Sequence, residues 1–351
     1  MKNQKYKTSG NRGLFDEQET YQKLSSIGNP LEKTNKVIDF EYFRNILEEG
    51  ILNNDKKSNA GAKRFDVVMM FKILILQRYY GLGDTQIEYQ ILDRLSFKKF
   101  LGLESGDKVP DEKTVWAFRE ILTSTGLIEK LFNKFRNYLE ERGLIMNEGK
   151  MVDASFTVAP RQRNTREENK MIKEGKGEEL WNDKPNKKRH KDIDARWTKK
   201  NNETFYGYKN HAKVDNKSKF IDKYKVTDAS IHDSQPLDDL LEEQDTGQEF
   251  YADSAYTGDD QEKVIDKYKM NNKVHEKGYR NKPLTEEQKV NNNEKSKTRA
   301  RVEHVFGFME QSMNGMAVRS VGMVRATALI GLINLTYNLF RYEQIVRLNI
   351  S

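Results

Sequence analysis

Three stretches of the sequence decide the fold class: FYGYKNHAKVD at residues 205–215, VTDASIHDS at residues 226–234 and YADSAYTG at residues 251–258. In the first stretch, Tyr206 and Tyr208 alternate as residues on one face of a strand do. In the last, Gly258 is typical of a turn. The three stretches therefore indicate strands near 205–215, 219–228 and 249–254, separated by turns.

Outward from these stretches, further β-like runs lie near 149–155 and 272–276, and helical patterns lie near 234–243, 259–269, 294–312 and 323–347. The order is three strands, then helix, strand, helix, strand and helix, which is the order of a ribonuclease-H-like fold. This order puts Asp153 on the first, central strand and Asp253 at the end of the adjoining fourth strand. Ligands collect at strand ends in such sheets.

The N-terminal half has a helical period. Five apolar residues recur at steps of three and four, as on one helix face: Val67, Met70, Phe71, Leu74 and Ile75. We expect residues 1–15 to be mobile, residues 16–145 to form an all-helical, DNA-binding domain, and residues 146–347 to form the ribonuclease-H-like catalytic domain. Helices and short Gly or Pro breaks alternate between residues 84 and 122, which favours a helix-turn-helix there. The alternative is a plain helical bundle that supports dimerisation.

Length and composition narrow the class of protein. A chain of 351 residues suits two domains. The net charge of +7 and the pI of about 9.1 favour a polyanionic partner. The absence of Cys excludes disulfides and Cys-ligated metal sites. The most apolar stretch, residues 326–340, is too short and too polar to span a bilayer, and no signal peptide begins the sequence, so we expect a soluble, cytoplasmic protein.

Three acidic residues have contexts that suit catalytic carboxylates. Asp153 and Asp253 each end an apolar run that predicts a core strand, and Glu303 lies on a basic helical segment. Carboxylate oxygens are the ligands that hard divalent cations prefer. Two such cations can hold the attacking and leaving oxygens of a phosphoryl transfer. The trio therefore predicts a two-metal site for phosphodiester chemistry.

The order of these acids and of the quoted stretches, with Arg299 four residues before Glu303, resembles the DDE transposases of bacterial insertion sequences. The insertion sequence 5 family is the nearest match in pattern, over roughly residues 15–345. The resemblance implies two Mg²⁺ ions, with Mn²⁺ able to substitute, held by Asp153, Asp253 and Glu303. It implies cleavage of double-stranded DNA at terminal inverted repeats, strand transfer into target DNA, and a homodimer in the DNA complex.

The same resemblance implies that Arg299 steadies Glu303 or binds a DNA phosphate. The family's glutamate helix often carries a Tyr and a Lys where this chain has Ser296 and Glu310. This departure concerns base flipping or a hairpin step, and it leaves the metal chemistry unaffected. Two other functions stay open: a ribonuclease-H-like nuclease without transposition, and a transposase-derived DNA-binding protein that is not an enzyme.

Residues 161–200 form a charged insertion after the first strand. They contain 14 Lys and Arg against 8 Asp and Glu, a net charge of +6. Four basic residues, Lys187, Lys188, Arg189 and Lys191, are candidate DNA-phosphate contacts; the alternative is a solvated loop. For Trp181 and Trp197 we favour structural anchoring over base stacking. We interpret His232 as a turn residue or a support for the site, with a direct role as the alternative.

Overall fold

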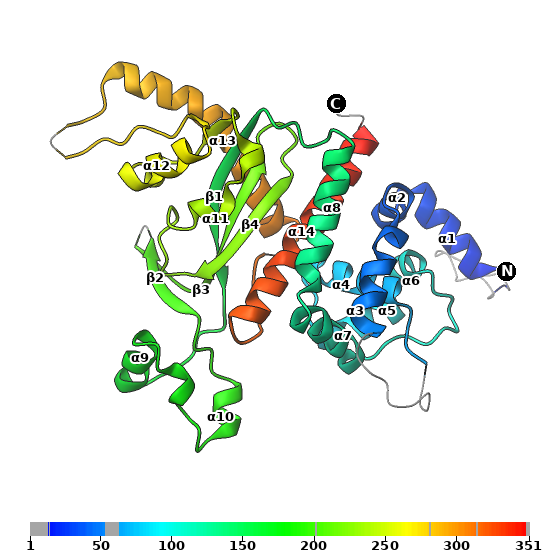
Figure 1. The fold of residues 1–351 in the computed structure, drawn as a ribbon. Helices are drawn as coiled ribbons and strands as arrows, with labels where there is room; N and C mark the ends of the chain where they lie inside the picture. The colour runs from blue at the N-terminus through cyan, green and yellow to red at the C-terminus, as the bar shows by residue number, and fades with distance from the viewer. Residues whose placement is uncertain are drawn as a thin grey trace, which may run out of the picture.

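The computed structural model describes residue 13 and residues 15–52, 63–200, 202–280, 282–313 and 315–348. The predicted mobile N-terminus lies almost wholly outside these residues. A group of helices lies on one side of the molecule and a twisted sheet with its own helices lies on the other (Figure 1). The C-terminal helix runs between the two parts.

The N-terminal half is helical, as predicted. It contains α1 (Asp16–Ser26), α2 (Pro30–Val37), the 3₁₀ helix η1 (Phe40–Phe43), α3 (Arg44–Leu52), α4 (Val67–Tyr79), α5 (Asp84–Asp93), α6 (Leu95–Leu101), α7 (Glu112–Ser124) and α8 (Leu127–Glu141). Side-chain caps start several of them; Asp66, for example, accepts the amides of Val68 and Met69 at 2.9 Å.

The C-terminal half is a mixed sheet with helices. Its strands are β1 (Gly149–Val158), β2 (Arg196–Lys200), β3 (Glu203–Asp215), β4 (Ile221–Asp228), β5 (Glu249–Tyr251) and β6 (Asn271–Asn272). Its helices are α9 (Arg166–Lys173), η2 (Gly177–Glu179), α10 (Pro185–Arg189), α11 (Leu237–Leu240), η3 (Glu243–Asp245), η4 (Ser254–Tyr256), α12 (Asp259–Lys267), α13 (Glu286–Gln311) and α14 (Met323–Leu348).

The sheet order agrees with the predicted ribonuclease-H-like arrangement. β1 lies between β3, with which it pairs antiparallel, and β5, with which it pairs parallel. β4 pairs with β3, and β6 extends the sheet beyond β5. β2 was not predicted; it pairs antiparallel with the first residues of β3. The central position of β1 was therefore predicted correctly from the order of elements along the chain.

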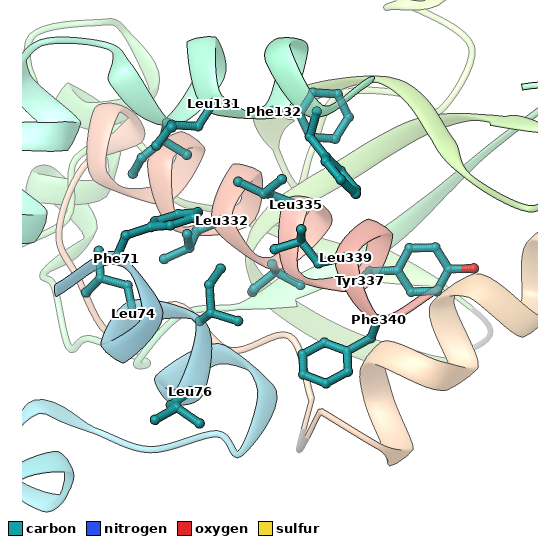
Figure 2. Packing of buried hydrophobic residues seen from close by; sticks show 14 of the residues in the cluster. Phe71, Leu74, Leu76, Leu131, Phe132, Leu332, Leu335, Tyr337, Leu339 and Phe340 are labelled. Atoms are coloured by element: carbon teal, nitrogen blue, oxygen red, sulfur yellow. The ribbon is translucent and has the colours of Figure 1, made fainter. Parts of the chain in front are cut away.

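One hydrophobic core joins the two halves of the chain. Helix α14 packs between α4 and α8 and also against β4, so residues far apart in sequence share one interior (Figure 2). The ring of Phe340 stacks on Tyr79 of α4 at 3.6 Å between centroids. By length and composition α14 could cross a membrane, but 72% of its most apolar window is buried inside the protein. It is therefore the central helix of the core.

The charged insertion is folded rather than a disordered loop, whereas its contact with DNA phosphates stays a prediction. Trp181 is only 7% exposed, and its indole N–H donates to Glu168 at 2.6 Å. The Asp192 carboxylate accepts the Tyr208 hydroxyl at 2.7 Å, and Asp194 accepts the amide of Met323 at 2.7 Å, at the start of α14. The insertion projects from the rest of the protein (Figure 1) but is anchored at its base.

Candidate active site

Two neighbouring parallel strands bring Asp153 and Asp253 together. The parallel pairing of β1 and β5 ends at Met151 and Tyr251, and each aspartate lies two residues beyond that pair. Asp253 follows the end of β5, as predicted. We had expected Asp153 to end its strand, but it lies within β1, opposite Ala212 of β3. The central strand, paired with β3 at Asp153 and with β5 two residues earlier, therefore holds the first carboxylate in place.

The backbone also fixes both aspartates locally. Asp253 is the N-cap of η4, and its Oδ1 accepts the amide of Ala255 at 2.8 Å. Asp153 Oδ1 accepts the amide of Ala154 at 2.8 Å. Each carboxylate thus keeps one oxygen in a backbone hydrogen bond. The other oxygen can face a ligand.

The third acid comes from α13, a helix that begins with a capping box at Thr285. Glu303 lies four residues after Arg299, so the two side chains share one face. Arg299 Nη2 donates to Glu303 Oε1 at 2.9 Å, and Arg299 Nη1 lies 3.6 Å from Asp153 Oδ2. The guanidinium therefore links the helix acid to the strand acid. The side chain of Glu303 is 57% exposed and has room to move.

The surroundings of Asp153 disfavour the ionised form of its carboxyl group. Burial raises its pKa to about 6, and the neighbouring Asp253 carboxylate adds to this. The amide of Ala154, Arg299 and Lys200 oppose the shift without cancelling it. A buried carboxylate beside a second one favours any added positive charge.

Sequence reasoning missed buried polar groups near the two aspartates. Tyr256 is 1% exposed, and its hydroxyl has no hydrogen-bond partner among the described residues. Burial, with the charges of Asp153, Asp233 and Asp253, raises its pKa well above the usual value. Asp233 itself pairs with Lys209 at 2.7 Å. Tyr256 lies three residues after Asp253 in the stretch 251–258, and this closeness in sequence could have indicated that Tyr256 lies near the site.

His232, another candidate, lies in the turn before α11. Its Nδ1 is 2.9 Å from the Ser234 hydroxyl. It is exposed. The buried histidine is instead His211, whose Nε2 is 2.8 Å from the Thr227 hydroxyl and whose pKa burial lowers to about 4. The structure thus gives His232 the position of a turn residue.

The basic candidates of the insertion are mostly engaged within it. Lys187 Nζ contacts Glu168 at 2.7 Å, Lys188 contacts the Glu178 carbonyl at 2.6 Å, and Lys191 contacts Asn164 at 2.8 Å. Arg189 is exposed, and no side-chain partner is seen for it in the described part of the chain.

Trp197 lies on β2 and is 45% exposed. Its ring packs on Tyr206 with centroids 4.9 Å apart, and the Arg161 guanidinium lies 5.6 Å from its ring. Trp181 is anchored inside the insertion, as favoured, whereas Trp197 keeps one surface accessible.

Two family models match the chain, and they decide which family these carboxylates represent. The model described as "Transposase DDE domain" matches residues 149–339, and the model described as "Transposase domain (DUF772)" matches residues 18–120. The chain belongs to the transposase DDE domain family. It is a DDE transposase of the insertion-sequence type, an enzyme that cleaves DNA and transfers strands. These matches favour the transposase over the nuclease and over the non-enzymatic DNA-binding protein. No solved structure matches the chain significantly.

Enzymes of the DDE family use divalent metal ions, and the two aspartates of this transposase fit such an ion. They offer only oxygen ligands, and burial beside a second carboxylate raises the pKa of Asp153, so a bound cation would stabilise its ionised form. Within the described ranges, however, no group of three acidic or His side chains is close enough to hold a metal. Glu303 is turned to Arg299 instead.

Proposed function

We propose that Asp153, Asp253 and Glu303 are the catalytic metal ligands of this transposase and hold two Mg²⁺ ions, with Mn²⁺ able to substitute. The substrate is double-stranded DNA at the terminal inverted repeats of an insertion sequence, and the freed 3′-hydroxyl joins target DNA. One observation carries the proposal: Asp153 and Asp253 each lie two residues beyond the last parallel pair of the adjacent strands β1 and β5. Arg299 connects this pair to Glu303.

The protein's contribution is to position charge. When bound, two divalent cations neutralise the phosphodiester, lower the pKa of the attacking water and align the attack. Asp153, whose backbone pairs with Ala212 of β3 two residues beyond the last β1–β5 pair, would contact both ions. Asp253 would hold one of the two ions and Glu303 the other. Arg299 would either keep its contact with Glu303 and steady that acid, or bind a DNA phosphate once Glu303 turned to hold a metal.

DNA binding involves more of the surface. The helical region 16–145, with its candidate helix-turn-helix, is proposed to contact the element ends, and two copies to act together as a homodimer on DNA in the cytoplasm. In the insertion, Arg189 and Trp197 are the candidates with accessible surface. Lys187, Lys188 and Lys191 contribute positive potential while they hold the insertion together. The similarity to the insertion sequence 5 family stays a prediction.

A cation series tests the proposal. Full-length protein should cleave element-end DNA in Mg²⁺ or Mn²⁺ and be inactive in EDTA or Ca²⁺, since Ca²⁺ binds oxygen ligands at longer, looser distances. In parallel, Mg²⁺ should raise the melting temperature of the wild-type protein but not that of Asp253→Asn. Strong cleavage in EDTA, or equal Mg²⁺ stabilisation of both proteins, would contradict it.

A further inference from the structure

A group of basic side chains lies on the flank of α13 away from the catalytic acids. We call Lys219, Arg301, His304 and Arg341 the cation cluster. Arg301 is about half a helical turn from both Arg299 and Glu303, and His304 shares its side of the helix. Lys219 comes from the turn between β3 and β4, and Arg341 comes from α14. Neither this flank nor its cations belong to the active site described above.

No carboxylate offsets these charges. Arg301 Nη1 donates to the Asn216 carbonyl at 2.7 Å, and Arg341 Nε donates to the Ser218 carbonyl at 2.9 Å. Within the described residues, neither arginine forms an ion pair with Asp or Glu. In the part of the chain that the structure describes, the partner of Lys219 Nζ is another basic side chain, with His304 Nδ1 at 3.0 Å.

The buried cation Lys213, by contrast, is neutralised by acidic partners. Lys213 pairs with Asp245 at 2.8 Å and with Asp222 at 3.1 Å. Lys219, Arg301 and Arg341 are partly buried and have no such acidic partner among the described residues. Arg341 Nη1 also donates to Gln344 Oε1 at 2.5 Å. Each guanidinium has five N–H groups, more than these contacts use, so donors are left for a ligand.

Lys219 is unfavourable for the free protein in two ways. Its backbone has φ +65°, a left-handed conformation that suits Gly or Asn better than Lys. Burial, together with the nearby Arg341 and Arg301, lowers its pKa. An anion bound among these cations would offset the charge penalty.

A cavity of about 330 Å³ adjoins the cluster. Lys219, His304 and Arg341 line it together with aromatic rings, among them Phe308 and Tyr337. Its only acidic lining residue in the described chain, Glu343, pairs with Arg347 at 2.7 Å. An opening with positive donors and no free carboxylate fits a phosphate group.

We propose that the cation cluster is a second phosphate-binding site that holds a DNA backbone on the flank of α13 opposite Glu303. The proposal rests on the proposed function, because DNA supplies the phosphodiester. Backbone phosphates carry no base sequence, so the site adds affinity and orientation rather than sequence recognition. The phosphate comes either from the element end, outside the cleavage point, or from target DNA.

Lys219→Asn separates a binding role from a structural one. Affinity is measured by fluorescence anisotropy in 50–200 mM salt, with an element-end duplex and with an unrelated duplex. Losing one phosphate contact should lower the slope of log affinity against log salt by about 0.9. The melting temperature should stay the same or rise, because strain and like-charge repulsion are both relieved. Arg341→Gln added to this variant should lower the slope by about 0.9 again.

The control is Lys217→Gln in the same turn. Lys217 is exposed, its Nζ pairs with Glu148 at 3.0 Å, and it carries the same charge. An unchanged slope in folded Lys219→Asn, or an equal loss in Lys217→Gln, would overturn the inference. A loss with both duplexes assigns the site to any DNA, including target; a loss with the end duplex alone assigns it to the element end. Wild-type protein that binds neither duplex would refute the proposed function instead.

Discussion

The Asp153 carboxylate should destabilise the metal-free protein at neutral pH. Its pKa is about 6 in the fold against an ordinary value of 3.8. Since each tenfold change in an ionisation constant is worth ~1.36 kcal/mol, this difference corresponds to at most about 3 kcal/mol. Two effects reduce this value. The Asp153 side chain keeps 18% of its surface exposed to solvent, and the amide of the substituted Asn must reproduce the hydrogen bonds of the carboxyl. We therefore expect Asp153→Asn to gain about 1–2 kcal/mol at pH 8.

The pH dependence has a definite sign. A carboxyl whose pKa is higher in the fold than in the unfolded chain binds its proton more tightly when folded. The favourable contribution of the Asp153 carboxyl to the free energy of unfolding is therefore complete below pH ~4. It is lost as the pH rises through about 6. The gain of Asp153→Asn over wild type should therefore be small at pH 4 and largest above pH 7.

Urea unfolding of both proteins in EDTA, at pH 4.5 and pH 8, measures this difference. Asp222→Asn is a control of opposite sign, because ion pairs with Lys213, Lys150 and Arg136 hold the pKa of Asp222 far below its usual range. That variant should lose stability at pH 8. A gain for Asp153→Asn that is absent at pH 8, or equal at both pH values, would refute the electrostatic reasoning.

Three further changes test other parts of the structure. Gly331→Ala places a methyl group against the Tyr224 hydroxyl and 3.2 Å from Ile128 Cγ2, so urea unfolding should show a loss of about 1–3 kcal/mol, partly recovered by adding Tyr224→Phe. Tyr256→Phe removes a buried hydroxyl that lacks a partner, so the free energy of unfolding should rise by about 1 kcal/mol; a fall would show that the hydroxyl is bonded. In the insertion, Arg189→Ala should lower the salt slope of DNA binding by about 0.9, whereas Lys187→Ala should instead make the insertion easier to cleave by protease, because it loses the contact with Glu168.

The strand order could be predicted because each strand and helix leaves a local pattern in the sequence. β2 was missed because its residues, RWTKK at 196–200, are mostly charged and form a strand by pairing with β3. The shared core was missed for another reason. The stacking of Phe340 on Tyr79 joins residues more than 250 positions apart, and no local pattern encodes such a contact.

Prediction of the site had the same limits. The sequence contexts and the order of Asp153, Asp253 and Glu303 led us to propose these three acids. It could not show that Glu303 is held by Arg299. Counting basic residues singled out the insertion, but a charge count cannot separate a paired side chain such as Lys187 from an accessible one such as Arg189.

The central claim is that the two strand aspartates and Glu303 cleave DNA together. Cleavage of element-end DNA in Mg²⁺ by Asp253→Asn tests it most directly, beside Asp259→Asn, which removes an exposed carboxylate from the first turn of α12. We predict a loss of roughly 100-fold or more for Asp253→Asn with DNA affinity kept, and a normal rate for Asp259→Asn. A normal cleavage rate in folded Asp253→Asn would contradict the account.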